Sequence, residues 1–259
     1  MVKMKTVYGP VPSWRLGKSL GIDVIAREKT CSFDCVYCQL GRTKNKTSKL
    51  QEFINVKRLE KDLGEVIKKV KADFITFSGM GEPTLASNLE QAVDVIRGLS
   101  NLPIAILSNS SLFSRKEVRK NLSKLDFIVA KLDVPNEKLF REINRPVKGI
   151  TFDKVLDGIK TVRKEFNGKF ALQTMFIDKN KNYVSELANL AREIEPDEVQ
   201  IDTPLRPCPI KPLNRKKLGE IKSQFKGLNT ISVYEAKRPK VKVLDIDEYL
   251  RRRPETWKK

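Results

Sequence analysis

Residues 31–38 read Cys31-Ser32-Phe33-Asp34-Cys35-Val36-Tyr37-Cys38, and the chain contains only one other cysteine. The C-x3-C-x2-C spacing allows three thiolates to converge on one cofactor. Cysteine thiolates are the usual ligands of iron–sulfur clusters, and a [4Fe–4S] cluster takes four ligands. Three protein ligands would leave one iron open to a ligand that is not protein, as in a catalytic metal site.

Three other interpretations of this loop are open. A structural zinc site requires a fourth ligand, but the chain has no histidine and its remaining cysteine, Cys208, lies far along the sequence. A disulfide framework is disfavoured, because a chain of 259 residues can bury its own core. The third interpretation is three unrelated buried cysteines. The spacing, together with a glycine-rich segment described below, favours the cluster.

The loop resembles the signature of the radical S-adenosylmethionine (SAM) superfamily, C-x3-C-x-aromatic-C, with Tyr37 at the aromatic position. Residues 8–17, 19–21 and 29–31 are similar to a subgroup of small archaeal and bacterial radical SAM proteins, although Trp14 replaces a second Arg. That subgroup resembles the wyosine-type tRNA-modifying enzymes, and most of its members have no assigned substrate.

The resemblance implies that Cys31, Cys35 and Cys38 hold a [4Fe–4S] cluster and that SAM binds its open iron. One electron from the cluster would break the sulfonium bond of SAM, giving methionine and a 5′-deoxyadenosyl radical that abstracts hydrogen from a substrate. An electron donor such as a ferredoxin or a flavodoxin is the expected partner.

Short β-branched apolar segments alternate with helical patterns, which is typical of repeated βα units around a parallel sheet. Strands are predicted over residues 20–26, 74–78, 104–108, 127–131, 170–176 and 198–202. Six βα units do not close an eight-stranded barrel, so we expect an α/β fold with an open, crescent-shaped sheet. The partial (β/α)6 barrel of radical SAM proteins has this form.

Two regions are predicted from composition. Residues 1–204 are expected to form the partial barrel with an N-terminal extension, and residues 205–259 a C-terminal extension that covers its open side. From Pro204 onward, across this boundary, the chain is rich in proline and basic residues, namely Pro204, Pro207, Pro209, Lys211, Pro212, Arg215, Lys216 and Lys217.

The segment Ser78-Gly79-Met80-Gly81-Glu82-Pro83 follows the second predicted strand, and its glycines allow the backbone to approach a ligand closely. Alone it would be an ordinary strand-to-helix turn. It resembles the superfamily's Gly-Gly-Glu segment, which pairs with the amino group of SAM. Because this segment follows the cysteine loop in the sequence, we predict that Gly79, Met80, Gly81 and Glu82 bind SAM.

Polar residues stand at the carboxyl ends of three more predicted strands, where parallel sheets bind ligands. They are Ser108, Asn109, Ser110, Lys131, Asp133, Gln173 and Thr174. The resemblance assigns such positions to SAM, and the alternative for each is a cap or turn former. Residues 144–146 and 200–204 are expected to border the pocket.

Cys208 follows the last predicted strand by six residues and is a candidate catalytic residue. A thiol facing the active site could donate a hydrogen atom or hold a methyl group, as in some radical SAM enzymes. The alternative is a half-buried cysteine without a role.

Lys and Arg total 51 against 32 Asp and Glu, a formal net charge of +19. This surplus predicts an anionic partner, and nucleic acid is the commonest. A thermophile surface is the alternative, but its ion-pair networks tend towards balance. With the resemblance, the charge favours RNA, and tRNA in particular. A small metabolite or a protein substrate stays open, as does an iron–sulfur carrier or RNA-binding module without catalysis.

No apolar run approaches the roughly 20 residues of a membrane span. The first five residues also lack the apolar stretch of a signal peptide. We expect a cytoplasmic monomer without a membrane partner, because sparse cysteines and an oxygen-sensitive cluster suit a reducing compartment.

Overall fold

The computed structural model describes residues 4–25 and 28–256. Its main sheet has eight strands in the order β1-β2-β5-β6-β7-β8-β9-β10, and only β1 and β2 pair antiparallel. The strands are β1 (Val7–Ser13), β2 (Gly17–Ile22), β5 (Phe74–Phe77), β6 (Ile104–Ser108), β7 (Phe127–Lys131), β8 (Lys169–Met175), β9 (Glu198–Asp202) and β10 (Thr230–Ser232). A second, two-stranded sheet joins β3 (Thr30–Cys31) to β4 (Asn45–Lys46).

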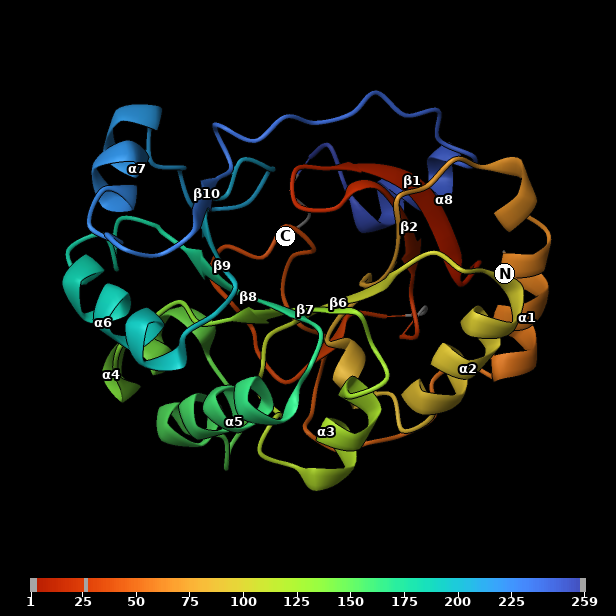
Figure 1. Cartoon of the computed structure of the whole chain (residues 1–259), viewed down its shortest axis with the longest axis horizontal. Helices are drawn as coiled ribbons and strands as arrows, with labels where there is room; N and C mark the ends of the chain where they lie inside the picture. Colours follow the sequence, from red (N-terminus) through yellow and green to blue (C-terminus); the bar gives the residue numbers. More distant parts are fainter. Residues whose placement is uncertain (1–3, 26–27, 257–259) are drawn as a thin grey trace.

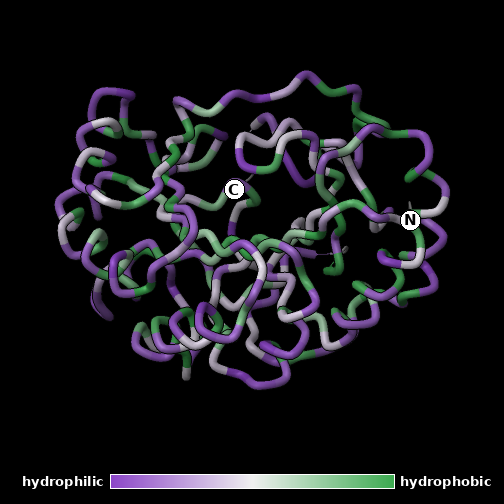
Figure 2. The backbone as a smooth tube through the Cα atoms, in the orientation of Figure 1, coloured by the Kyte–Doolittle hydropathy of each residue, from purple (hydrophilic) through white to green (hydrophobic). Residues whose placement is uncertain are grey.

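Helices cover the convex face of the curved sheet (Figure 1). They are α1 (Val56–Gly64), α2 (Leu89–Leu99), α3 (Lys116–Leu122), α4 (Glu137–Leu139), α5 (Phe152–Glu165) and α6 (Val184–Ile194). Along these helices polar and apolar residues alternate in Figure 2, as expected where one face of a helix packs on a sheet. The predicted partial (β/α)6 barrel is confirmed. None of the helices in the described part of the chain is long and apolar enough to span a bilayer.

Besides the short β3 and β4, the structure adds two strands of the main sheet that the sequence did not predict. β1 contains Pro10 and Pro12, and proline is compatible with a strand at the edge of a sheet, which is where β1 lies. β10 has only three residues, too few to give a periodic signal. β2 ends at Ile22, short of the prediction, and residue 26 lies outside the described residues.

Side chains of the parallel strands alternate between the helix-covered face and the inner face. Lys131 lies beside Gln173 in register, and Gln173 lies beside Gln200. These polar residues therefore form a row on the inner face. An apolar cluster of Leu16, Ala105, Phe127, Val129 and Ala171 lies towards the amino ends of the strands. The inner face is thus apolar at one end and polar at the carboxyl end, where a site is expected.

The C-terminal extension contributes α7 (Arg215–Lys222), β10 and α8 (Ile246–Arg252). β10 pairs with β9, and α8 packs against β1, so the extension touches both margins of the crescent. Figure 1 shows residues 233–245 crossing the open side between them. Because β10 belongs to the main sheet, the division of the chain at residue 204 stays a prediction.

Arg252 fastens α8 to the barrel. Its side chain is fully buried, its Nε lies 2.8 Å from Asp23 Oδ2, and its Nη2 donates to the Lys5 carbonyl at 2.7 Å. Its Nη1 also pairs with Glu248 one turn earlier. Asp23 Oδ2 accepts from the Met80 backbone N–H at 3.2 Å. The end of the chain is therefore coupled to the glycine-rich segment.

We expect Arg252→Met to destabilise the protein by about 3 to 5 kcal/mol, because it removes the buried cation that two carboxylates contact. Chemical denaturation of the full chain would measure the change. Arg251→Met is the matched control, because Arg251 is half-exposed and its contact with Glu248 is 3.9 Å long. An exposed pair of this kind contributes about 1 kcal/mol or less. Equal losses for both variants would contradict this role of Arg252.

Candidate active site

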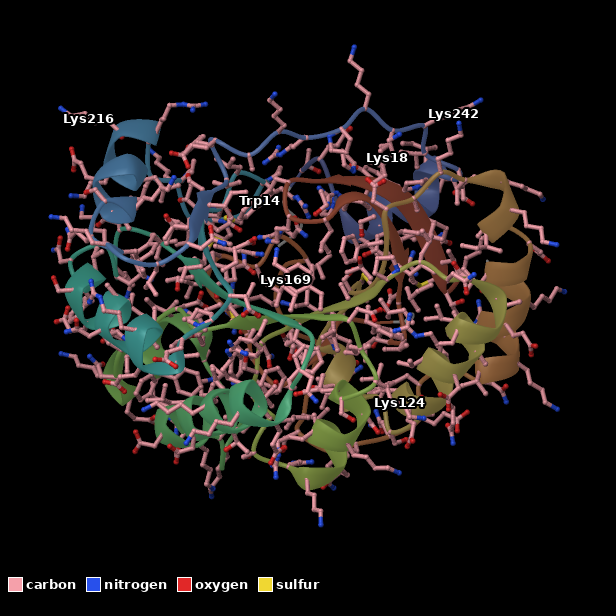
Figure 3. The ribbon with its side chains drawn as sticks, viewed as in Figure 1. Trp14, Lys18, Lys124, Lys169, Lys216 and Lys242 are labelled. Atoms are coloured by element: carbon pink, nitrogen blue, oxygen red, sulfur yellow. The ribbon has the colours of Figure 1, made fainter. Side chains whose placement is uncertain are left out.

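A cavity of about 360 Å³ lies inside the curved sheet. The strands contribute inner-face residues such as Thr76, Lys131, Gln173 and Asp202 to its wall. The β1–β2 hairpin, the cysteine loop and the C-terminal extension complete the lining. Trp14, at the hairpin tip, lies within the ring of surrounding elements in Figure 3. The cavity therefore brings together segments from the whole length of the chain.

Two of the three cysteines of the loop lie at this cavity. Cys35 and Cys38 line it, and Cys31 belongs to β3. All four cysteines of the chain are free, which leaves the disulfide alternative without support. Within the described residues, no group of three or more His, Cys, Asp or Glu side chains is arranged to hold a single metal ion. This finding adds no support for the zinc alternative.

Amide donors point at two of the sulfur atoms. Asn109 Nδ2 lies 3.4 Å from Cys31 Sγ, and Asn144 Nδ2 lies 3.5 Å from Cys35 Sγ. Hydrogen bonds to cysteine sulfur are one of the means by which proteins tune iron–sulfur clusters. Asn144 therefore contacts the cysteine loop, although residues 144–146 do not line the cavity, and Asn109 reaches the loop from the end of β6.

Burial raises the pKa of the Cys31 thiol far above its ordinary value, and the Glu82 carboxylate adds to the effect. Burial, followed by the charge of Asp133, raises the pKa of Cys35 to about 11. A thiolate in such surroundings needs a cationic partner, and an iron centre supplies one. The donor set and its environment fit three ligands of an iron–sulfur cluster.

A bridge between Thr30 and Gly81 joins the cysteine loop to the glycine-rich segment. Thr30 N donates to the Met80 carbonyl at 3.0 Å, and Glu82 N donates to the Thr30 carbonyl at 3.1 Å. A Cβ atom at Gly81 would lie 1.7 Å from the Thr30 carbonyl oxygen, so only glycine permits this approach. Gly79 and Gly81 both line the cavity. The two predicted cofactor segments thus lie side by side.

Met80 and Glu82 are placed differently from Gly79 and Gly81, because neither of them lines the cavity. The Glu82 carboxylate is held by protein donors. Its Oε1 accepts from Thr84 N, Thr84 Oγ1 and Ser108 Oγ at 3.1, 2.7 and 2.7 Å, and its Oε2 accepts from Asn109 N at 2.7 Å. The residue is 2% exposed and does not line the cavity. Burial raises the pKa of the carboxyl, while the bonds from Asn109, Thr84 and Ser108 oppose that effect. Its carboxylate is thus occupied by protein donors. Through Ser108 and Asn109, Glu82 connects the segment after β5 to the end of β6 behind the site.

The predicted residues on β7 form a network with the cysteine loop. Asp133 accepts from Tyr37 Oη and, at 2.8 Å, from Asn144 Nδ2. Lys131 Nζ lies 3.5 Å from Asp133 Oδ1 and 4.9 Å from the centre of the Tyr37 ring. Lys131 and Tyr37 line the cavity, whereas Asp133 lies behind them.

The remaining predicted residues also divide into those that line the cavity and those that lie behind its wall. Gln173 lines the cavity and donates to Asp202 Oδ2 at 2.7 Å. Asp202, Thr203 and Pro204 also line it, as expected for residues 200–204. Supporting positions behind the wall are held by Ser108, Ser110 and Thr174, whose hydroxyls bond to Glu82, Lys131 N and the Leu132 carbonyl.

Cys208 does not line the cavity. It is half-buried, its Sγ lies 3.3 Å from the Ile210 carbonyl oxygen, and burial raises the pKa of its thiol. Its catalytic role stays a prediction that this geometry does not favour.

Several residues of the cavity were not predicted as functional. They are Tyr8, Trp14, Arg15, Arg206, Arg238 and Arg253. They come from the β1–β2 hairpin and the C-terminal extension, and each looks in sequence like an ordinary surface or turn residue. Two local signals were available: the resemblance of residues 8–17 to radical SAM proteins and the run of arginines at 251–253.

The radical SAM superfamily model matches residues 29–191. The chain is 42% identical to the UPF0026 protein MJ1312 of Methanocaldococcus jannaschii over 210 residues, 79% of this chain and 65% of that protein. It is also 42% identical to the UPF0026 protein slr1464 of Synechocystis over 217 residues, 82% and 79% of the two. The solved structure of native anSMEcpe with bound AdoMet resembles the fold with a TM-score of 0.64 at 20% identity, over 83% of this chain and 64% of that one.

The chain therefore belongs to the radical SAM superfamily. Its relatives within that superfamily are UPF0026 proteins. Members of this superfamily use a [4Fe–4S] cluster and SAM as cofactors. The match covers just under two thirds of the Methanocaldococcus protein, at 65% of its length.

Proposed function

We propose that this enzyme modifies a nucleotide in RNA, in particular tRNA, in a reaction related to that of the wyosine-type enzymes. The observation that carries the proposal is a basic segment at the mouth of the cavity. Residues 236–244 contain Lys237, Arg238, Lys240 and Lys242, all exposed, and no acidic residue. Figure 1 shows this segment crossing the open side of the barrel, and Figure 3 shows Lys242 pointing outward from it. An RNA backbone lying on it would present a base to the cavity.

The roles of the protein side chains follow from their positions. Cys31, Cys35 and Cys38 would hold the cluster, and the backbone of Gly79 and Gly81 would border SAM. When bound, the cluster and SAM supply reductive cleavage of the sulfonium bond and thereby the radical chemistry. Lys131 and Gln173 offer donors from the strand ends, while the apolar inner cluster excludes water from the opposite end of the barrel.

The proposal extends to the partners and the setting of the enzyme. A ferredoxin or a flavodoxin would provide the electron. The enzyme would act as a cytoplasmic monomer, and its many surface ion pairs suit a thermophile. A radical SAM enzyme for a small metabolite or a protein is the second candidate, for which the basic surface would have no role in binding substrate.

We expect Lys237→Gln, Lys240→Gln and Lys242→Gln together to weaken tRNA binding and to lower the slope of log affinity against log salt. Each lost phosphate contact reduces that slope by about 0.7 to 0.9. Filter binding or fluorescence anisotropy at several salt concentrations would measure both. Neutralising Lys211, Arg215, Lys216 and Lys217 tests, in the same assay, whether the α7 region extends the RNA-binding face.

The matched control replaces Lys68, Lys69 and Lys71 with Gln. These three lysines are also exposed, and they precede β5 at the amino end of that strand. The control should bind tRNA as the parent protein does. Equal losses in the two triple variants would show that the charge acts without a specific face, and tRNA binding insensitive to salt would refute the RNA proposal.

A further inference from the structure

Five arginines line the cavity, namely the ion-paired Arg252 and four others from segments far apart in the sequence. Arg15 lies in the β1–β2 turn, Arg206 follows β9, Arg238 lies in the crossing segment and Arg253 follows α8. We propose that Arg15, Arg206 and Arg253 form a binding site for a phosphate group of the substrate, with Arg238 at its rim. This inference rests on the proposed function, because it names the part of the nucleotide that the cavity recognises.

Arg15 has donor capacity that the protein leaves unused. Its Nη2 pairs with Asp202 Oδ2 at 2.5 Å, and its guanidinium lies 4.2 Å from the centre of the Trp14 ring. Its Nε is buried and has no hydrogen-bond acceptor among the described residues. A buried donor without a partner costs about 1 to 3 kcal/mol, so a ligand oxygen at this point would be stabilising.

Arg206 and Arg253 add charge that no carboxylate of the described chain neutralises within ion-pair distance. Arg206 Nη1 donates to the neutral Gln39 Oε1 at 2.6 Å. Burial, followed by the charges of Arg253 and Arg15, lowers the pKa of Arg206 to about 9. Burial also lowers the pKa of Arg253. Guanidinium groups of arginine stay charged at neutral pH, so the two side chains repel each other unless an anion lies between them.

The acidic side chains near the cavity do not cancel this charge. Asp202 is the only carboxylate among its described lining residues, and it already bonds to Arg15 and Gln173. Arg252 and Lys131, by contrast, have carboxylate partners in Asp23 and Asp133. Of the five arginines that line the cavity, Arg15 and Arg252 pair with carboxylates, whereas Arg206, Arg238 and Arg253 have no carboxylate within ion-pair distance among the described residues. The cavity is therefore a cationic pocket.

A phosphate group suits this pocket better than a carboxylate does. Guanidinium forks bind planar or tetrahedral oxyanions through paired, charge-assisted hydrogen bonds. A phosphate offers more oxygens and more negative charge than a carboxylate, so one group can contact several arginines at once.

The test uses inorganic pyrophosphate as the probe and calorimetry on the anaerobic, reconstituted full chain. We expect Arg206→Gln and Arg253→Gln together to weaken pyrophosphate binding at least about tenfold, because two charge-assisted contacts are lost. Pyrophosphate should raise the melting temperature of the parent protein but not of this variant. The Lys68→Gln, Lys69→Gln and Lys71→Gln control should behave as the parent does. Equal binding by all three proteins would overturn the site.

A second readout separates a binding role from a structural one. Without pyrophosphate, the double variant should melt at or above the temperature of the parent, because like charges have been removed. A lower melting temperature together with unchanged pyrophosphate affinity would mean that the arginines only support the fold. If the double variant does not fold, Arg206→Gln and Arg253→Gln as single variants provide the same comparison.

Two further measurements complete the test: pyrophosphate binding in the presence of saturating SAM, and tRNA binding by the double variant. Pyrophosphate should bind equally well with SAM present, and its displacement by SAM would assign the arginines to the cofactor and overturn the proposal. Weaker tRNA binding by the double variant would place an RNA phosphate at the site. If the double variant lost pyrophosphate binding but bound tRNA as the parent does, the phosphate site would stand and would belong to a free nucleotide. That result would count against the RNA proposal.

Discussion

Replacing Cys35 with serine is expected to abolish SAM cleavage and to remove the cluster. A serine hydroxyl is not deprotonated at neutral pH and is a poor ligand for iron, so only two of the three thiolates would remain. The neighbouring donors, Asn144 and Asp133, cannot compensate, because one is an amide and the other is already bonded to Tyr37, Asn144 and the Met175 backbone. Anaerobic reconstitution followed by iron analysis should show about four irons in the parent protein.

Cys208→Ser is the matched control for this experiment. It makes the same chemical change at a half-buried cysteine that does not line the cavity, and it should keep the full iron content. If Cys35→Ser retained its iron and still cleaved SAM, the assignment of the cluster to residues 31–38 would be wrong. Loss of iron in Cys208→Ser would instead bring Cys208 into the cluster site.

Replacing Gly81 with alanine is expected to reduce SAM cleavage by about 100-fold or more, since even a 1 Å displacement of reacting groups can have that effect. The added Cβ would lie 1.7 Å from the Thr30 carbonyl oxygen, which is part of the backbone and cannot turn away. The glycine-rich segment must then move away from β3 and from Cys31. Cleavage of SAM after dithionite reduction would measure the loss.

Gly98→Ala provides the comparison, because no atom lies within 4 Å of a Cβ at this helical position. Alanine favours a helix over glycine, so this variant should keep full activity and gain up to about 1 kcal/mol of stability. Iron content should be read in both variants. Normal cleavage by Gly81→Ala would show that contact between the two segments is not required to place SAM.

Glu82 shows how the site differs from its sequence-based interpretation. The resemblance assigned its carboxylate to the amino group of SAM, yet four protein donors already occupy that carboxylate. Its effect on SAM is therefore expected to be indirect, through the positions of Gly81 and Asn109. We therefore expect Glu82 to support the backbone around Gly79 and Gly81 and not to contact SAM itself.

The sequence by itself determined the features that local spacing encodes. The cysteine spacing of residues 31–38 predicted the cofactor, and alternating short strands and helices predicted the open barrel, because periodicity and ligand spacing are properties of neighbouring residues. Three of the six predicted strands, at residues 104–108, 127–131 and 198–202, have the observed bounds.

Only the tertiary structure decided where long-range partners meet. Glu82 is occupied because β6 brings Ser108 and Asn109 to it, which no local pattern could show. Arg15 and Arg206 are nearly two hundred residues apart in sequence, and the curvature of the sheet and the path of the extension bring them to one cavity. Burial then removes the solvent that would screen their charges, so residues that look like ordinary surface arginines in the sequence become a candidate binding site.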